Sequence, residues 1–103
     1  GTYLPAVKGA GNNFDTVLGI LEVINSNVGE RIACEILLRP QQVMIHADAD
    51  SDIKVIEQQF MGDHCRYVIN VQGVKLLAQS NQLLMVGQRV SVEVEASSAI
   101  VFE

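Results

Sequence analysis

Apolar and polar residues alternate along most of the chain, and a period of two is typical of strands with one buried face. The clearest example lies near the C-terminus, where Val90, Val92 and Val94 are separated by Ser91 and Glu93. No window of about 11 residues sustains the 3.6-residue period of a helix. The pattern therefore predicts short strands at 31–38, 43–47, 53–61, 64–71, 74–79, 90–95 and 99–102.

The alternation also predicts which face of a strand is buried. In the strand at 31–38, one face carries only apolar side chains, namely Ile32, Cys34, Ile36 and Leu38, and Pro40 ends the strand. The stretch 17–24 contains Gly19 and several β-branched residues, which favour a bent strand over a helix.

Two glycine-containing dipeptides predict tight turns between strands. Gly62-Asp63 suits a type II′ turn, because glycine accepts a positive φ without steric cost, and Gln72-Gly73 suits a second hairpin. Strands joined in this way form a meander, and closure into a barrel removes the exposed edges. We expect an all-β fold in one domain, 1–103. It would contain a small barrel of short antiparallel strands at 20–103 and a hairpin-like extension at 1–19.

Charge and composition exclude several kinds of partner. The chain of 103 residues has a net charge of −5, and its seven basic residues are scattered. Phosphate backbones and anionic lipids repel such a chain, so we expect no nucleic-acid binding. No apolar run reaches the roughly 20 residues that span a bilayer, so no membrane insertion is expected.

Cysteine usage indicates a reducing compartment. Cys34 and Cys65 are too few for a disulfide scaffold and have no zinc-binding spacing. Each lies within an apolar alternation, so both are predicted to be buried, reduced thiols in a cytosolic protein.

The residues that catalysis needs are not arranged for it. The sequence has no Gly-Lys pair and therefore no P-loop for nucleotide phosphates. Its two histidines are His46 and His64, and His64 lies at a predicted turn beside Asp63 and Cys65. Neighbouring residues in an extended chain point to opposite faces, so Cys65 and His64 do not form a catalytic pair. We predict that the chain is not an enzyme.

One acidic stretch is a weak candidate for a metal site. Asp48, Asp50 and Asp52 repeat the first half of a calcium-binding loop, in which alternate carboxylates face one ion. That loop also requires glycine at its sixth position and glutamate at its twelfth, where this chain has Ile53 and Gln59. A solvated loop without a metal is the stronger interpretation.

Three short motifs in order resemble a known family: Leu38-Arg39-Pro40-Gln41-Gln42-Val43, Phe60-Met61-Gly62-Asp63-His64 and Gly87-Gln88-Arg89-Val90. Together they resemble the transport-associated OB-fold (TOBE-type) domain at the C-terminus of ABC importer ATP-binding subunits. Tyr3-Leu4-Pro5-Ala6 is similar to the start of this region in ferric-iron importers. Relatives usually have an acid where this chain has Gln41.

The resemblance implies an OB-fold-like barrel that acts by contact rather than by catalysis. The implied partners are a second copy of the subunit, the ATPase domain of the same polypeptide and the permease in the inner membrane. The implied location is the cytoplasmic face of that membrane. ATP and magnesium would belong to the ATPase domain, and no cofactor is expected here. The motif residues Arg39, Pro40, Gln41, Gly62, Asp63, His64 and Gly87 are candidates for interfaces, although each also fits a purely structural role.

The sequence leaves two alternatives open. The barrel could instead sense a small solute or anion and give feedback on transport. It could also be a separate oligonucleotide-binding barrel, which the charge and the few aromatic residues disfavour. Because the chain starts with Gly1 and lacks an initiator methionine, we expect it to be a piece of a longer protein.

Overall fold

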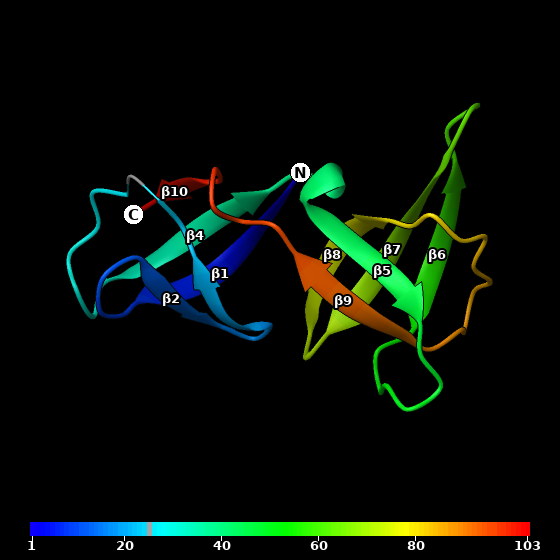
Figure 1. Ribbon diagram of the computed structural model, residues 1–103, viewed down its shortest axis with the longest axis horizontal. Coiled ribbons are helices and arrows are strands. Elements are labelled where there is room, and N and C mark those ends of the chain that lie inside the picture. The colour runs from blue at the N-terminus through cyan, green and yellow to red at the C-terminus, as the bar shows by residue number, and fades with distance from the viewer. Residues whose placement is uncertain (25) are drawn as a thin grey trace.

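The strands form two five-stranded sheets in a computed structural model that describes residues 1–24 and 26–103 (Figure 1). The elements in chain order are β1 (Thr2–Lys8), β2 (Asn13–Thr16), β3 (Gly19–Glu22), β4 (Ala33–Leu38), the 3₁₀ turn η1 (Pro40–Gln42), β5 (Val43–Ala47), β6 (Val55–Phe60), β7 (Cys65–Val71), β8 (Val74–Gln79), β9 (Val90–Val94) and β10 (Ile100–Phe102). The predicted all-β fold class is confirmed.

The first sheet is entirely antiparallel and has the strand order β10-β4-β1-β2-β3. Its central strands are β1 and β4, which pair over six residues from Thr2 opposite Leu38 to Val7 opposite Ala33. The short C-terminal strand β10 pairs with the other side of β4. The two ends of the described chain therefore lie in one sheet (Figure 1).

The second sheet has the order β6-β7-β8-β5-β9 and closes into a barrel. Its single parallel pair joins β5 to β8. Closure occurs where the start of β9 meets the start of β6, through a bridge between Lys54 and Arg89. A hydrogen bond of 2.9 Å from the Val90 N–H to the Ile53 carbonyl completes the contact. This closed barrel agrees with the prediction of a small OB-like fold.

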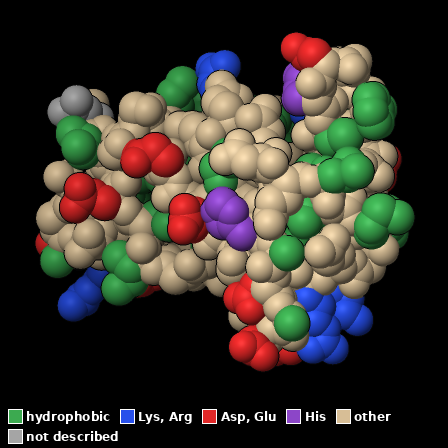
Figure 2. Space-filling model, turned by 45° about the vertical axis from the view of Figure 1, so that its right-hand side comes forward, with side chains coloured by type: hydrophobic (Ala, Val, Ile, Leu, Met, Phe, Trp, Pro, Cys, Tyr) green, Lys and Arg blue, Asp and Glu red, His purple; other side chains and the backbone are tan. Residues whose placement is uncertain are grey.

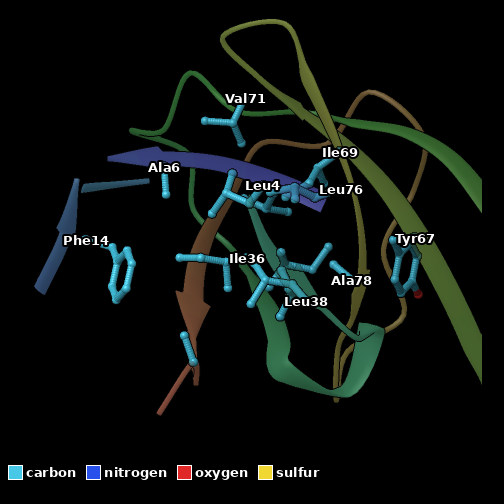
Figure 3. Packing of buried hydrophobic residues seen from close by; sticks show 14 of the residues in the cluster. Leu4, Ala6, Phe14, Ile36, Leu38, Tyr67, Ile69, Val71, Leu76 and Ala78 are labelled. Atoms are coloured by element: carbon cyan, nitrogen blue, oxygen red, sulfur yellow. The ribbon is translucent and has the colours of Figure 1, made fainter. Parts of the chain in front are cut away.

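One hydrophobic core joins the first sheet to the barrel. Figure 3 shows Leu4 and Ile36 of the first sheet beside Ile69 and Leu76 of the barrel. All four side chains are fully buried. A hydrogen bond of 3.3 Å from the Leu77 N–H to the Thr2 hydroxyl also links β8 to β1. The two sheets therefore do not form separate cores.

Both predicted turns have the backbone that their residues suggested. Gly62 has a φ of 92° and stands first in its turn, as type II′ requires. Gln72 and Gly73 both have positive φ, 50° and 88°, as in a type I′ turn. A hydrogen bond of 2.8 Å from the Gly73 N–H to the Asn70 side-chain oxygen stabilises this second turn.

The structure differs from the sequence-based predictions in the first third of the chain. Residues 17–24 are not one bent strand, because Val17 and Leu18 form the turn between β2 and β3. The Thr16 hydroxyl accepts the Leu18 N–H at 3.0 Å and so supports that turn. Ile32 is 43% exposed and precedes β4, so it does not share the buried face.

Strand pairing does not set residues 1–19 apart as an accessory hairpin. β1 forms its longest pairing with β4, and β2 continues into β3 within the same sheet. The barrel strands lie between Val43 and Val94, whereas the prediction placed the barrel at 20–103. The cause is long-range pairing: the alternating pattern of β1 does not reveal which strand it will meet.

Lys8 is a buried charged residue at a position where the alternating pattern predicts an apolar side chain. It is 7% exposed and follows Leu4 and Ala6 on the inner face of β1. Its Nζ donates hydrogen bonds to the carbonyl of Gly9, at 2.6 Å, and to that of Gly11. The ammonium also lies 5.7 Å from the centre of the Phe14 ring. Lys8 therefore stabilises the turn between β1 and β2.

Replacing Lys8 by alanine should destabilise the fold. The Lys8→Ala variant loses two charge-assisted hydrogen bonds and the packing of the lysine stem, so we expect the free energy of unfolding to fall by about 1–3 kcal/mol. Denaturant titration would measure this loss. Lys75→Ala, at an exposed position of β8, is the matched control and should change stability by less than about 0.5 kcal/mol. Equal effects of the two substitutions would contradict this role for Lys8.

Candidate functional site

The family-motif residues lie in three separate places. Arg39, Pro40 and Gln41 belong to the link between β4 and β5, whereas Gly62, Asp63 and His64 are at the β6–β7 turn. Gly87 lies in the segment between β8 and β9. Figure 1 shows the β6–β7 turn projecting from the end of the barrel, away from the link at η1. The structure therefore does not assemble these residues into one site.

The Arg-Pro motif shapes the chain where it passes from the first sheet into the barrel. Pro40 is buried and opens η1, while Arg39 and Gln41 are exposed. The Gln42 side-chain oxygen accepts the Arg39 N–H at 2.9 Å, and the Gln42 carbonyl accepts the Glu95 N–H at 2.9 Å. These contacts give the motif a structural role, and the exposed Gln41 side chain stays available at the surface.

The residues at the β6–β7 turn form an exposed acid–histidine pair. The Asp63 carboxylate lies 2.7 Å from His64 Nδ1. Two hydrogen bonds lower the pKa of the Asp63 carboxyl. The one from the His64 ring has the larger effect, and the one from the Asp63 backbone N–H has the smaller effect. A fully solvated pair of this kind contributes little stability. Among the described residues, no nucleophile is in hydrogen-bond contact with it, so the geometry does not make it a catalytic centre.

The acidic stretch 48–52 is organised as a turn. The Asp48 carboxylate accepts the Asp50 N–H at 3.0 Å, and the Ser51 hydroxyl accepts the Ile53 N–H at 3.1 Å. Across residues 1–24 and 26–103, no group of three histidine, cysteine, aspartate or glutamate side chains is placed to hold a metal ion. The three aspartates do not converge as in a calcium loop.

The two cysteines are free thiols in different surroundings. Cys34 is buried, and its Sγ lies 3.6 Å from the Ala6 carbonyl. Burial, and then the nearby Glu103 carboxylate, raise the pKa of the Cys34 thiol, which disfavours the reactive thiolate. Cys65 is only half-buried, so the prediction of full burial is wrong for it. The Gln58 side-chain amide lies 3.6 Å from the Cys65 sulfur.

Hydrophobic side chains are exposed at the end of the barrel. We call the barrel-end surface the set of exposed apolar residues on β6, at the turn that follows it and on the segment after β8, namely Ile56, Phe60, Met61, Leu83, Met85 and Val86. Phe60 and Leu83 are the most exposed of them, at 76% and 74%. Figure 2 shows hydrophobic side chains gathered over this right-hand end of the molecule. Exposed apolar groups grouped in this way are typical of contact surfaces.

The segment that carries part of this surface is held firmly by the barrel. Tyr67 is 1% exposed, and its hydroxyl accepts the Leu84 N–H at 3.1 Å and donates to the Gln82 carbonyl at 3.2 Å. Leu84 itself is buried and anchors the segment in the core. Further along, Gly87 donates its N–H to the Val55 carbonyl at 2.7 Å. Leu83 and Met85, on either side of Leu84, are thereby held outward.

A second apolar surface lies on the outer face of the first sheet. We call the sheet-face surface the apolar side chains of β1, β4 and β10 that point away from the core, namely Tyr3, Pro5, Val7, Ala33, Leu37, Ile100 and Phe102. Tyr3 packs edge-to-face on Phe102, with 5.8 Å between ring centres. The outer side of an antiparallel sheet is usually polar when water covers it, so this face is also suited to contact.

A pocket adjoins the start of β10. This pocket, of about 710 Å³, is lined by Ile24, Val28 and Ala99 and by the serines Ser26, Ser97 and Ser98, among others. The Ser26 hydroxyl is buried and has no hydrogen-bond partner among the described residues. The Ser97 N–H and hydroxyl both donate to the Glu95 carboxylate, and these bonds lower the Glu95 pKa.

The fold is a small, all-β domain built on a closed barrel. A family model described as TOBE domain matches residues 36–102, which covers β4 in part and everything from η1 to β10. The chain therefore belongs to the TOBE domain family. No curated protein and no solved structure matched the chain. In the described part of the chain, no helix is long and apolar enough to cross a membrane.

Removing the Tyr67 hydroxyl should loosen the barrel-end surface. In Tyr67→Phe the Leu84 N–H and the Gln82 carbonyl lose their partner, so the free energy of unfolding should fall by about 1–3 kcal/mol. Amide hydrogen exchange at Leu84 should also accelerate. Tyr3→Phe, at a half-exposed position of β1, is the control, with an expected change below about 0.5 kcal/mol. Unchanged exchange at Leu84 would show that another contact holds the segment.

Proposed function

We propose that this TOBE domain is the regulatory contact domain of an ABC importer's ATP-binding subunit, acting at the cytoplasmic face of the inner membrane. TOBE domains occur in the regulatory C-terminal regions of ABC transporters, and the family match supports that role. The domain would bind the ATPase domain of its own polypeptide, a second copy of the subunit and, through the subunit, the permease. Ferric iron is the proposed cargo, on the resemblance of Tyr3-Leu4-Pro5-Ala6 to ferric-iron importers.

The observation that carries this proposal is the presence of two apolar surfaces at different ends of the molecule. The longest dimension is 40 Å, with the sheet-face surface on the first sheet and the barrel-end surface on the barrel (Figure 1). A domain with two contact surfaces can hold two partners at once. A change in one contact then alters the other, provided that the partners move between two states.

The sheet-face surface is the proposed contact with the ATPase domain. β1, the first strand, lies in this sheet, so a domain preceding it in the polypeptide would join the chain here. Apart from Glu35, the side chains that β1, β4 and β10 turn to this face are uncharged. On the same face, Asp15 of the neighbouring strand β2 lies opposite Val7. A mostly apolar surface with few charges matches the composition of the buried centre of an interface.

Charge placed on this face should uncouple the importer. In the full polypeptide with its permease, Phe102→Glu should lower transport-coupled ATP turnover by about tenfold while leaving nucleotide binding unchanged. Ala49→Glu, at an exposed position in the acidic loop, is the control with the same added charge. Unchanged coupled turnover in Phe102→Glu would contradict the proposal. So would a parent polypeptide that lacks a P-loop and an ABC signature.

Solute sensing is a second candidate, and the pocket beside β10 favours it. Its hydroxyls and its apolar lining suit a small ligand with a few hydrogen-bonding groups. Ferric citrate, maltose, spermidine or molybdate should then raise the melting temperature of the chain. Ala99→Trp, which fills the pocket, should abolish the shift. A melting temperature that no solute changes would argue against sensing by this domain.

A further inference from the structure

β6 is an edge strand that the barrel closes over only part of its length. Near its start, the Val55 N–H donates to the Gln88 carbonyl at 2.9 Å, and the Val55 carbonyl accepts the Gly87 N–H. A β-bulge follows at Ile56, between Val55 and Glu57. Beyond the bulge, among the described residues, β6 has no backbone hydrogen bond on the side away from β7. The second half of β6 is therefore an open edge.

The pairing with β7 determines which backbone groups point outward. The Met61 N–H donates to the His64 carbonyl at 2.9 Å, so these residues form the hydrogen-bonded pair next to the turn. Bonded and non-bonded pairs alternate in an antiparallel ladder. Phe60, opposite Cys65, and Gln58, opposite Tyr67, are therefore non-bonded toward β7. Their N–H and C=O groups point away from the barrel.

The open edge lacks the usual protection against pairing with another strand. Natural edges are commonly guarded by lysine, proline or a bulge. Residues 57–60 contain neither lysine nor proline, and the bulge lies before them. Glu57 is the only charged residue of these four. The apolar residues Phe60 and Met61, at the far end of the strand, are exposed beside the edge.

We infer that a second copy of the chain pairs with this edge, antiparallel and symmetric about Gln59. In that register the outward backbone groups of Gln58 face those of Phe60 of the partner subunit. The N–H and C=O groups of each strand then form hydrogen bonds with those of the other. The two Gln59 side chains lie opposite each other. This inference supplies a surface for the pairing of two copies in the proposed function, and it rests on that function in this respect.

The side chains of the edge favour a second copy over a foreign strand. A two-fold pairing brings the same patch together from both subunits, so the patch must complement itself. About Gln59, the single charge of Glu57 faces Met61 of the partner subunit and not another carboxylate. Neutral amides meet at the centre, where glutamine side chains can bond to each other. Exposed apolar side chains of the barrel-end surface lie beside the two paired β6 strands and would be buried when these strands pair.

In this register Gln59 lies opposite Gln59 of the partner subunit, so charged substitutions at this position test the proposed pairing directly. Gln59→Lys and Gln59→Glu each place like charges directly opposite each other and should each raise the dimer dissociation constant by about tenfold or more. An equimolar mixture of the two variants should restore association, because lysine then faces glutamate. Sedimentation velocity over a wide range of protein concentrations would measure all three. Ala49→Lys, at an exposed position in the acidic loop, is the control with an added positive charge and should dimerise like the unchanged chain.

Each result bears on the inference. Circular dichroism and melting temperature establish that the variants fold. Loss of the dimer in both single variants, with recovery in the mixture, would support pairing through β6. A dimer that persists in Gln59→Lys would overturn the β6 register and leave pairing through another surface. An unchanged chain that stays monomeric would overturn the inference, whereas the contact with the ATPase domain is tested separately by Phe102→Glu.

Discussion

The closure of the barrel by the segment Gly87–Val90 is the contact on which the rest of the structure depends. The segment binds the start of β6 through the carbonyl and N–H of Val55 and through the Lys54–Arg89 bridge. Without it, β6 and β9 would be two unpaired edges, and the inner faces that form half of the core would be open to water. Closure also fixes the course of the preceding residues, so that Leu84 fills the interior while its neighbours face outward.

Local features of the fold could be predicted from the sequence because they depend on neighbouring residues. β5 and β8 have the bounds that alternation predicted, and Gly62 occupies the turn that its conformational freedom suggested. The pairing of β1 with β4 and the parallel contact of β5 with β8 could not be predicted in the same way. Both pairings join segments far apart in sequence, and a two-residue period does not indicate which strand pairs with which.

For the candidate site, prediction from the sequence was limited for a different reason. The motif residues were found by resemblance, and the structure places them in turns and links, where proline and glycine are needed for backbone reasons. The contact surfaces were missed because an exposed leucine or phenylalanine has the same pattern signature as a buried one. Leu83 and Leu84 are adjacent and identical in type, yet one is 74% exposed and the other 1%. Contacts with distant strands determine which of them is inside, among them the hydrogen bonds of the Tyr67 hydroxyl to Gln82 and Leu84 and that of the Gly87 N–H to the Val55 carbonyl.

The pairing of β10 with β4 has a consequence for how the domain is built. Leu37 and Ile100 are direct partners across these two strands, although the whole barrel lies between them in sequence. In architectural terms the barrel is an insertion at the tip of a hairpin, whose two arms remain side by side in the first sheet. The chain enters and leaves the insertion at one point, where the Gln42 carbonyl accepts the Glu95 N–H. The covalent connection alone would allow the barrel to be replaced without cutting the sheet, but the shared core would not, because Leu4 and Ile36 would lose the barrel side chains that bury them.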